Sequence, residues 1–441
     1  MKLTVFPSNK GDCLLVSGGR GGQILVDGGM IGSYRDYVAP GLGELQARGE
    51  HLDLVCVTHI DDDHISGIVR LMDDLRAWRV YDYQSRPETE NPQPRPPKSP
   101  RPPEVEAVWH NGFESQVGRG ASEIAAMLSA TTTILAGSDD ERIRDLVLEQ
   151  RAIVTGIPQA ETLAQRLAAD QLDIPLNPHY DGKMVSLDAR KRPTRVGSLR
   201  ITVIGPTKTR LTELRRHWKK WLEENRARLA RIEEEARDNR LPPVTGAFSN
   251  AAQLIQPMLA QARALAAAGE VTVPNLASVM MLVEEEDRSL LLTGDGIGED
   301  VLTGLRRVRK LNRQGRIHVD VLKVQHHGAV ANITPAFCRA VTADHYVFCG
   351  NGAHHNPEPE VVSMIVAARL DPATPHGDRQ FKLWFNSSGT FGGTELQQKH
   401  MRRIEADVRR LAATADGRME FAFITDEEWR DRHRFELTFA D

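Results

Sequence analysis

Short apolar runs separated by glycine, proline and charged turns dominate the first 80 residues. The opening stretch, KLTVFPSNKGDCLLVSGGRGGQILVDGGM at 2–30, has the pattern of two or three strands joined by glycine turns. The run LDLVCV at 52–57 has the pattern of a buried strand, and HISGIVRLMDDLRAW at 64–78 has the apolar spacing of an amphipathic helix. This order of strands and helices favours an α/β fold.

The same strand pattern returns later in the chain. Four apolar runs predict strands: EVEAVWHNGF at 104–113, SLRITVIGPT at 198–207, HVDVLKVQHHG at 318–328 and HYVFCGNGAHHNP at 345–357. ASVMMLVEEEDRSLLLTGDG at 277–296 has the pattern of two strands around an acidic turn. Aspartate or histidine stands at the end of several of these runs. Loops at one edge of a sheet could therefore bring those side chains together.

Proline-rich and charged segments interrupt this core. The loop at 84–103 contains too many prolines for the interior of a helix or a sheet. Helical patterns fill two insertions, at about 114–195 and 208–270, and the tail has the pattern of a helix followed by two strands. We expect one α/β domain over 1–393 and a small C-terminal α+β extension over 394–441.

The second insertion begins as a long charged helix with one apolar seam. Its segment RRHWKKW at 215–221 combines four basic residues with Trp218 and Trp221, a composition suited to nucleic-acid backbone and bases. Both tryptophans lie on the apolar seam, however, and acidic residues follow them. We expect a packing or regulatory element rather than a nucleic-acid contact. Such an exposed helix also suggests activation by a protease or by a regulatory partner protein.

Composition narrows the class of protein. The formal net charge of −4 gives no overall attraction to nucleic acid or membrane, although a local basic groove is compatible with it. The sequence shows neither a signal-peptide pattern nor an apolar run of membrane-spanning length. The four cysteines are scattered without a CxxC pair, which favours buried thiols in a reducing compartment. The prediction is a soluble cytoplasmic protein with no membrane partner, and the oligomeric state is left open.

The segment VTHIDDDHISG holds a dense set of metal-ligand types. Four of its residues stand at relative positions 1, 3, 5 and 6, namely His59, Asp61, Asp63 and His64. Carboxylates and imidazoles together suit zinc, manganese or iron. The competing interpretation is a helix N-cap, because acidic residues favour the first turn of a helix. A cap accounts for one aspartate but not for two flanking histidines. Asp295, at a later strand end, is well placed as a carboxylate shared by two metal ions.

Five motifs follow one another along the chain: KGDCLLV with ILVDGG, THIDDDHISG, NLASVMMLVEEEDRSLLLTGD, DVLKVQHHGA and GNGAHHNPEPEVV. Together they resemble the metallo-β-lactamase superfamily, in the HxDxDH form of its ComEC-type branch. The resemblance covers roughly 1–80, 195–207 and 272–366. It implies a metallo-β-lactamase-like αββα sandwich, interrupted here by the helical insertions, and a metal-dependent hydrolase.

The resemblance also implies metal ligands, with two departures from the superfamily pattern. Asp61 replaces the histidine that zinc β-lactamases carry, and the usual third-motif histidine is absent between 64 and 295. We therefore expect one strong metal site and a weaker second one, filled by one or two zinc or manganese ions. The expected ligands are Asp63, His64, Asp295 and one histidine of the 326/327 pair, taken as His327, for the strong site, and His59 and Asp61 for the weaker site.

A water activated by the metal would be the nucleophile. Four residues are candidates for catalysis: Asp61, Asp63, His326 and His355. Either aspartate could orient the water, while a histidine of the 326/327 pair, with His354 or His355, could hold the substrate oxyanion or protonate the leaving oxygen. An exposed polar loop is the alternative for His354 and His355. Lys323 is expected at a surface strand position rather than in contact with a phosphate. Asn275 and Ser278 are expected to order the backbone near the site.

The main functional hypothesis follows from the resemblance. It is a metal-dependent phosphodiesterase, a soluble nuclease acting on DNA or RNA, with the helical insertion or a partner as a gate. One alternative is a metallo-hydrolase of small esters, lactams or thioesters. Another is a metal-stabilised, non-catalytic subunit of a larger assembly. A membrane DNA-channel subunit fits least, because no membrane-spanning segment is visible in the sequence.

Overall fold

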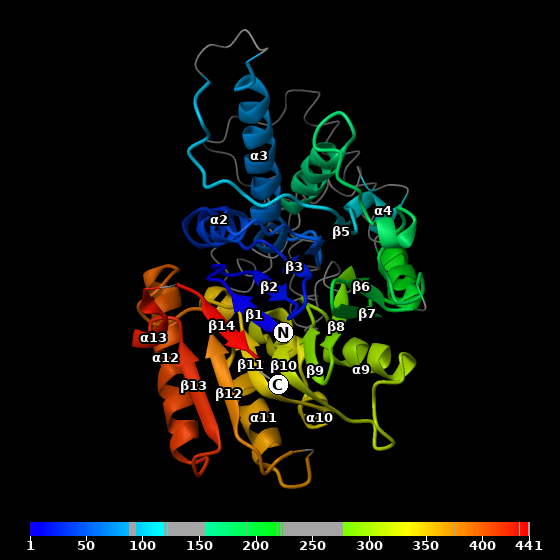
Figure 1. Cartoon of the computed structure of the whole chain (residues 1–441). Coiled ribbons are helices and arrows are strands. Elements are labelled where there is room, and N and C mark those ends of the chain that lie inside the picture. Colours follow the sequence, from blue (N-terminus) through cyan, green and yellow to red (C-terminus); the bar gives the residue numbers. More distant parts are fainter. Residues whose placement is uncertain are drawn as a thin grey trace, which may run out of the picture.

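The computed structural model describes residues 1–87, 94–118, 121, 155–190, 192–217, 219–220, 223, 277–374, 376–431 and 433–439. These residues form four layers, in which two sheets pack face to face and helices cover both outer faces (Figure 1). The predicted fold class, an αββα sandwich of the metallo-β-lactamase type, is confirmed.

The first sheet has six strands in the order β14–β1–β2–β3–β4–β5. Their bounds are β1 Lys2–Val5, β2 Leu14–Ser17, β3 Gln23–Val26, β4 Leu54–Val57, β5 Val108–His110 and β14 Phe435–Thr438. Strands β1, β2 and β3 are antiparallel neighbours, whereas β3, β4 and β5 run parallel. The carboxyl ends of β1, β3 and β4 therefore lie at the same edge of the sheet.

The second sheet has eight strands in the order β13–β12–β11–β10–β9–β8–β7–β6. Their bounds are β6 Thr194–Val196, β7 Leu199–Gly205, β8 Met280–Glu285, β9 Arg288–Leu292, β10 Ile317–Lys323, β11 Val341–Phe348, β12 Phe381–Phe385 and β13 Met419–Phe423. Strands β9 to β13 run parallel, and β6 to β9 are antiparallel. The loops that follow β9, β10 and β11 therefore share one edge.

Helices cover the outer faces of the sheets. The first sheet is covered by α2 Ala39–Ala47 and α3 Asp62–Gln84, and the second by α9 Gly298–Arg307, α10 Pro335–Ala340, α11 Pro359–Leu370 and α12 Glu395–Ala413. The shorter elements are α1 Ile31–Ser33, η1 Tyr34–Val38, α4 Phe113–Val117, η2 Pro178–Tyr180, η4 Gln325–Gly328, η5 Val330–Asn332, η6 Ala353–His355 and α13 Glu427–Arg430.

Strand β4 shows why the sequence forms this sandwich. Its side chains are buried on both faces, with Leu54 and Cys56 in the core between the sheets and Val55 and Val57 in the core under the helices. A strand covered on both sides has no polar face, so it is apolar without alternation. The run LDLVCV therefore predicted a buried strand correctly.

Helix α3 leads directly out of this region. Asp62 and Asp63 lie in its first turn, where the helix dipole favours carboxylates. Its buried apolar residues pack against the first sheet. A side chain at Gly67 would place its Cβ atom 1.9 Å from the Gly28 carbonyl oxygen. Glycine at this position therefore allows the start of α3 to lie against the end of β3.

Several predicted segments fall partly outside the described residues. This applies to the middle of the proline-rich loop at 84–103, to part of the insertion at 114–195, to most of the insertion at 208–270, and to Trp218 and Trp221. Within the first insertion the described residues include a helix over 155–167. The tail at 394–441 contributes α12 and two edge strands, β13 in the second sheet and β14 in the first.

None of the helices in the described part of the chain combines the length and the apolar character needed to cross a membrane.

The buried imidazole of His110, at the end of β5, predicts a pH effect on stability. The side chain is 3% exposed, and neither ring nitrogen has a hydrogen-bond partner among the described residues. Burial lowers the pKa of His110 from 6.5 to about 4. The unfolded chain therefore takes up this proton below pH 6.5, whereas the folded protein takes it up only below about pH 4, so stability falls as the pH falls between these values.

Between pH 7 and pH 5 this histidine should remove about 2 kcal/mol from the free energy of unfolding. In His110→Phe this loss of about 2 kcal/mol should be absent. The difference in the free energy of unfolding between pH 7 and pH 5 should therefore be smaller by the same amount. Urea denaturation of both proteins at each pH measures it. The same pH dependence in both proteins would contradict the prediction.

Candidate metal centre

Loops from both sheets meet at the edge where the strands end. The loops after β1, β3 and β4 contribute Asp12, Asp27, His59 and Asp61, and the first turn of α3 contributes Asp63 and His64. The loop after β9 contributes Asp295, and η4, which follows β10, contributes His326 and His327. All of these side chains except His326 are buried. The fold thus gathers residues from distant parts of the chain into one cluster, which we call the metal centre.

The Asp295 carboxylate lies in the middle of the metal centre. Its Oδ2 atom is 3.4 Å from His64 Nε2 and 3.4 Å from His327 Nε2. The same oxygen is 3.5 Å from His59 Nε2 and 3.7 Å from His326 Nε2. Burial raises the pKa of Asp295, but the nearby histidines, His327 first, lower this pKa by more, so it lies well below its usual range. Asp295 is therefore the anion around which the imidazoles are arranged.

Asp27 fixes the orientation of His64. The Asp27 Oδ2 atom is 2.9 Å from His64 Nδ1 and also accepts a hydrogen bond from Thr58 Oγ1. Its Oδ1 atom accepts a hydrogen bond of 2.7 Å from the backbone N–H of Thr58. These contacts hold the proton of His64 on Nδ1, which leaves Nε2 directed at Asp295 as a ligand atom.

Asp12 belongs to the metal centre but was not singled out from the sequence. Asp12, His64, Asp295 and His327 each offer one ligand atom, and these atoms all lie within 4.8 Å of one another. Asp12 Oδ1 is 3.2 Å from His327 Nδ1. Gly11 lets this loop approach, because a Cβ atom there would lie 1.7 Å from the Asp63 carbonyl oxygen. The available signal was an aspartate directly before a strand in the motif KGDCLLV.

Lys323 is buried in the metal centre, so the predicted surface position is wrong. Its side chain is 1% exposed, and its Nζ atom forms an ion pair with Asp12 and donates a hydrogen bond of 2.9 Å to the Gly294 carbonyl oxygen. The same atom is 3.6 Å from Asp295 Oδ1. Burial lowers the pKa of Lys323, but Asp12 and Asp295 raise this pKa by more, so it lies above its usual range. Lys323 therefore compensates two buried carboxylates.

The three remaining residues of the histidine–aspartate segment lie beside Asp295. His59 Nε2 is 3.7 Å from Asp61 Oδ2, and burial, reinforced by the charge of His64, lowers the pKa of His59 to about 3. Burial and the neighbouring Asp63 raise the pKa of Asp61 well above its usual value. Asp63 Oδ2 is 3.7 Å from His327 Nε2. The predicted ligands of both sites are thus within one cluster.

The buried atoms of the metal centre fit a bound cation. Several ligand-type atoms have no hydrogen-bond partner among the described residues, namely Asp12 Oδ1, His59 Nε2, Asp61 Oδ1, His64 Nε2, Asp295 Oδ1 and both ring nitrogens of His327. Each buried polar atom without a partner costs about 1–3 kcal/mol. A divalent ion coordinated by imidazole nitrogens and carboxylate oxygens would offset this cost.

The two histidine pairs have an unusual backbone conformation. His326 and His327 have φ values of 45° and 56°, and His354 and His355 have values of 51° and 62°. A positive φ is uncommon outside glycine, and such residues concentrate at functional sites. His326 Nδ1 is also 2.9 Å from Asn332 Oδ1, which steadies the ring beside Asp295.

Of the predicted pair at 354 and 355, His354 lies closer to the metal centre. It is partly buried, its Nδ1 atom has no partner among the described residues, and burial, with the nearby charge of Lys10, lowers the pKa of His354 to about 4. His355, the predicted catalytic residue, is exposed, and its ring lies 5.8 Å from that of His400. Within the described chain we find no contact between His355 and the metal centre.

Ser278 lies beside the metal centre, and Asn275 lies outside the described residues. Ser278 is 1% exposed, and the next residue, Val279, donates a backbone hydrogen bond of 2.8 Å to the Thr58 carbonyl oxygen. This bond joins the loop before β8 to the end of β4, whereas the Ser278 Oγ atom has no hydrogen-bond partner among the described residues, so the expected ordering role of Ser278 stays a prediction.

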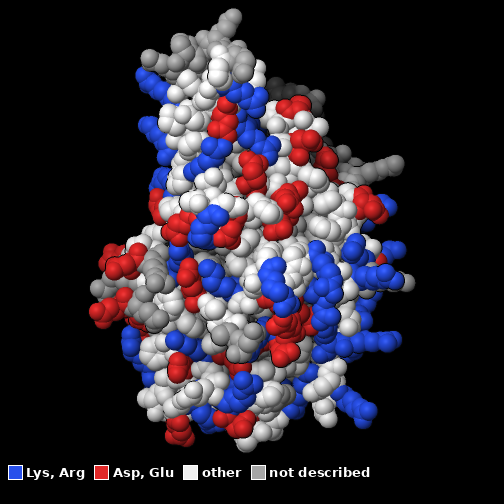
Figure 2. All heavy atoms as spheres, viewed as in Figure 1, with Lys and Arg blue, Asp and Glu red and all other residues white. Residues whose placement is uncertain are grey.

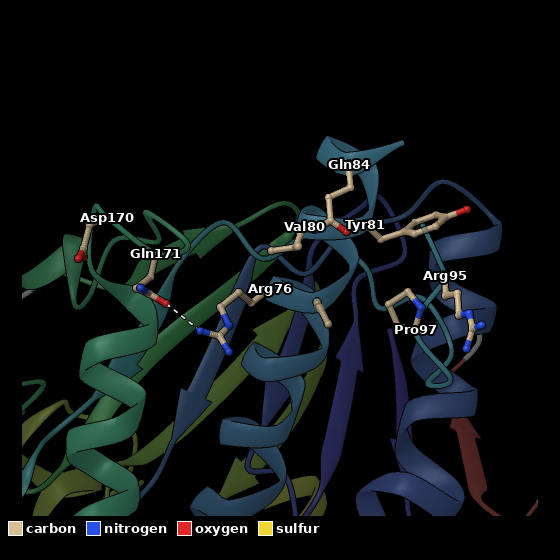
Figure 3. Close-up of a pocket in the computed structure, with 9 residues that line it drawn as sticks. Arg76, Val80, Tyr81, Gln84, Arg95, Pro97, Asp170 and Gln171 are labelled. Carbon is tan, nitrogen blue, oxygen red and sulfur yellow. Dashed lines mark hydrogen bonds between the residues drawn. The ribbon is translucent and has the colours of Figure 1, made fainter. Parts of the chain in front are cut away.

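A wide cavity elsewhere is separate from this chemistry. It has a volume of about 560 Å³ and lies beside the C-terminal half of α3, where Arg76 donates a hydrogen bond of 3.3 Å to Gln171 (Figure 3). Arg76 stands 12 residues after His64 on α3, which corresponds to about 18 Å along a helix. This cavity therefore does not contain the reacting groups.

The chain combines an αββα sandwich with a buried cluster of aspartates and histidines that could hold a metal ion. The sequence profile of the Metallo-beta-lactamase superfamily matches residues 9–132. The matched segment includes Asp12, Asp27 and the whole histidine–aspartate segment, so the similarity covers the half of the centre that the first sheet provides. No curated protein matches the chain.

Proposed function

We propose that this protein is a phosphodiesterase of the ComEC type that cleaves nucleic acid with the help of bound zinc or manganese. The observation that supports the proposal most strongly is the arrangement of four imidazoles around one oxygen of Asp295, at 3.4–3.7 Å. A carboxylate shared in this way suits two neighbouring divalent ions. Such ions supply Lewis-acid activation of water and of a phosphoryl oxygen.

The balance of ligand types favours a phosphate diester over a lactam or thioester. Four aspartates accompany the histidines, namely Asp12, Asp61, Asp63 and Asp295. Carboxylate oxygens are hard ligands that suit manganese and other ions used in phosphate chemistry. Lys10, on the same loop as Asp12, is close enough for its charge to lower the pKa of Asp63 against the effect of burial. This lysine supplies a positive charge where a phosphate would enter.

The remaining side chains have roles that follow from their positions. Asp61 lies beside His59 and Asp63 lies beside His327, and either carboxylate can orient an attacking water. His354, partly buried with an unpaired Nδ1 atom, can contact a substrate oxygen. The helical insertion predicted as a gate lies mostly outside the described residues.

A broad basic surface is not needed for this proposal. The face shown in Figure 2 mixes lysine and arginine with aspartate and glutamate, in agreement with a net charge of −4. Nucleic acid would then be held mainly at the metal centre and its rim. A modest salt dependence of binding is the corresponding expectation, because few phosphates would be neutralised by side chains.

The test uses purified protein stripped of metal and reloaded with manganese or zinc. Single-stranded and double-stranded DNA and RNA should be cleaved only after reloading. Asp63→Ala should lower the rate of cleavage at least about 100-fold. The reason is that even residues that only hydrogen-bond to metal ligands contribute about 10–100-fold to metal affinity or activity. Asp73→Ala, a carboxylate on the same helix that pairs with Arg166, is the matched control and should cleave normally. Metal-loaded protein that cleaves none of the four substrates would contradict the proposal.

A further inference from the structure

A small cavity next to the metal centre has three asparagines and two aromatic residues in its lining. Its volume is about 190 Å³, and we call it the amide pocket. The residues on which its chemistry depends are Asn9, Tyr37, Asn351, Asn386, Ser387 and Phe391. They come from the loop after β1, from η1, and from the loops after β11 and β12.

One of these loops also contributes to the metal centre, and a second one touches it. Asn9 stands three residues before Asp12, and the two belong to the same loop. Asn351 belongs to the loop that carries His354, and its Nδ2 atom donates a hydrogen bond to Asn9 Oδ1. A Cβ atom on Gly350 would lie 3.2 Å from the Cβ atom of His327, so this loop touches the metal centre directly. A group in the amide pocket is therefore a short distance from a phosphate at the metals.

Asn386 gives the amide pocket a buried hydrogen-bond acceptor with no partner. The side chain is 2% exposed. Its Nδ2 atom donates to the Phe6 carbonyl oxygen at 3.0 Å and to Ser8 Oγ at 2.8 Å, which fixes the orientation of the amide. Its Oδ1 atom has no hydrogen-bond partner among the described residues. A buried acceptor without a partner is costly, and an N–H group of a ligand would satisfy it.

Two aromatic rings form another wall of the amide pocket. The centroids of Tyr37 and Phe391 are 5.6 Å apart. His433 stacks on Phe391 with an interplanar angle of 16°, which holds that ring in place. Both Tyr37 and Phe391 are partly exposed, so a flat ligand can reach them. Aromatic side chains of this kind stack on nucleobases.

The charge and size of the amide pocket select the kind of ligand. Asp36 lies in its lining, and no lysine or arginine is among the described residues that line it. An anionic phosphate is therefore disfavoured. The volume of about 190 Å³ is below the roughly 300–1,000 Å³ typical of pockets for larger ligands. The pocket thus suits one neutral ring system with hydrogen-bond donors on its edge.

We propose that the amide pocket receives a nucleobase adjacent to the phosphate that is cleaved, with its ring against Phe391 and Tyr37 and an edge N–H group donating to Asn386 Oδ1. This inference rests on the proposed nuclease function and adds a specificity site to it. The protein would then require a base, and not only a phosphodiester, at this position of its substrate.

The decisive comparison is between an oligonucleotide with all its bases and the same oligonucleotide with one abasic residue placed in turn at each position. Phe391→Ala should raise KM for the complete oligonucleotide roughly 5- to 150-fold, the range expected for loss of one stacking contact, with kcat unchanged. Phe391→Trp should restore KM. At one position, the abasic residue should raise KM for the normal protein. With that oligonucleotide, the normal protein and Phe391→Ala should have the same KM. Tyr83→Ala, an exposed aromatic residue on α3, is the control and should behave normally.

A second measurement separates failure of this inference from failure of the proposed function. Free nucleosides are titrated into the normal protein and into Phe391→Ala by calorimetry, which does not depend on cleavage. Binding to the normal protein that is weakened in Phe391→Ala supports the amide pocket even if no nucleic acid is cut. Normal cleavage with no effect of Phe391→Ala or of any abasic position would overturn the inference while leaving the nuclease proposal intact. Absence of both cleavage and nucleoside binding would overturn both.

Discussion

Asp295→Asn is expected to abolish metal-dependent hydrolysis. The substitution keeps the size of the side chain but removes the negative charge that faces His59, His64, His326 and His327 at 3.4–3.7 Å. Without the shared carboxylate the imidazole nitrogens no longer surround an anion, and two cations would repel each other across the site. Removal of groups outside the ligand shell already costs about 10–100-fold in metal affinity. Loss of Asp295 should cost more.

The measurement has two parts. Metal content after dialysis is determined by mass spectrometry, and phosphodiester cleavage is followed with a chromogenic diester. Asp320→Asn is the matched control, because this carboxylate lies on β10 and accepts hydrogen bonds from Ser289 outside the metal centre. Full metal content and normal cleavage in Asp295→Asn would show that the carboxylate is not a shared ligand.

Lys323→Met should produce the largest loss of stability. Lys323 is 1% exposed and compensates the buried carboxylates of Asp12 and Asp295. Removing one partner of a buried ion pair leaves an uncompensated charge, which costs about 3–5 kcal/mol. The expected result is a decrease of this size in the free energy of unfolding of the metal-free protein. A bound divalent ion should recover part of the loss, because it supplies positive charge at the same place.

The double variant Lys323→Met with Asp12→Asn tests the cause. Removing both charges of a buried pair is far less costly than removing one, so the double variant should be more stable than Lys323→Met alone. Asparagine retains an oxygen that can face His327 Nδ1, 3.2 Å away in the native protein. Urea denaturation with and without metal measures all three proteins. Equal losses in the single and double variants would mean that packing, and not charge, dominates.

Local pattern predicted an α/β fold and one half of the metal centre, whereas the αββα sandwich was implied by the resemblance to the metallo-β-lactamase superfamily. The apolar run of β4 identified a buried strand, and the spacing of His59, Asp61, Asp63 and His64 placed a ligand set at its end. These features are visible because all the information lies within a few consecutive residues. The position of Asp295 after a strand was visible for the same reason.

Local pattern did not show that the Lys323 side chain is buried, and it did not distinguish His354 from His355. Lys323 stands on a strand whose neighbours gave no sign that its charge would be buried, and its partner Asp12 is distant in the sequence. Backbone angles do not distinguish His354 from His355, because both residues have positive φ; they differ in burial, since His354 is partly buried and His355 is exposed. Burial of a charge and the direction of a side chain after a left-handed residue are set by tertiary contacts, which the sequence pattern does not contain.

The pairing of β14 with β1 has a consequence during synthesis of the chain. Residues 2–5 pair with residues 435–438, so the first sheet cannot reach its full width before the end of the chain is made. The metal centre likewise needs both Asp12 and His327. The ligand set is therefore incomplete until residue 327 has been synthesised. The metal centre is completed late, after most of the chain has been made, so the activity proposed for it would be confined to chains that have passed this stage.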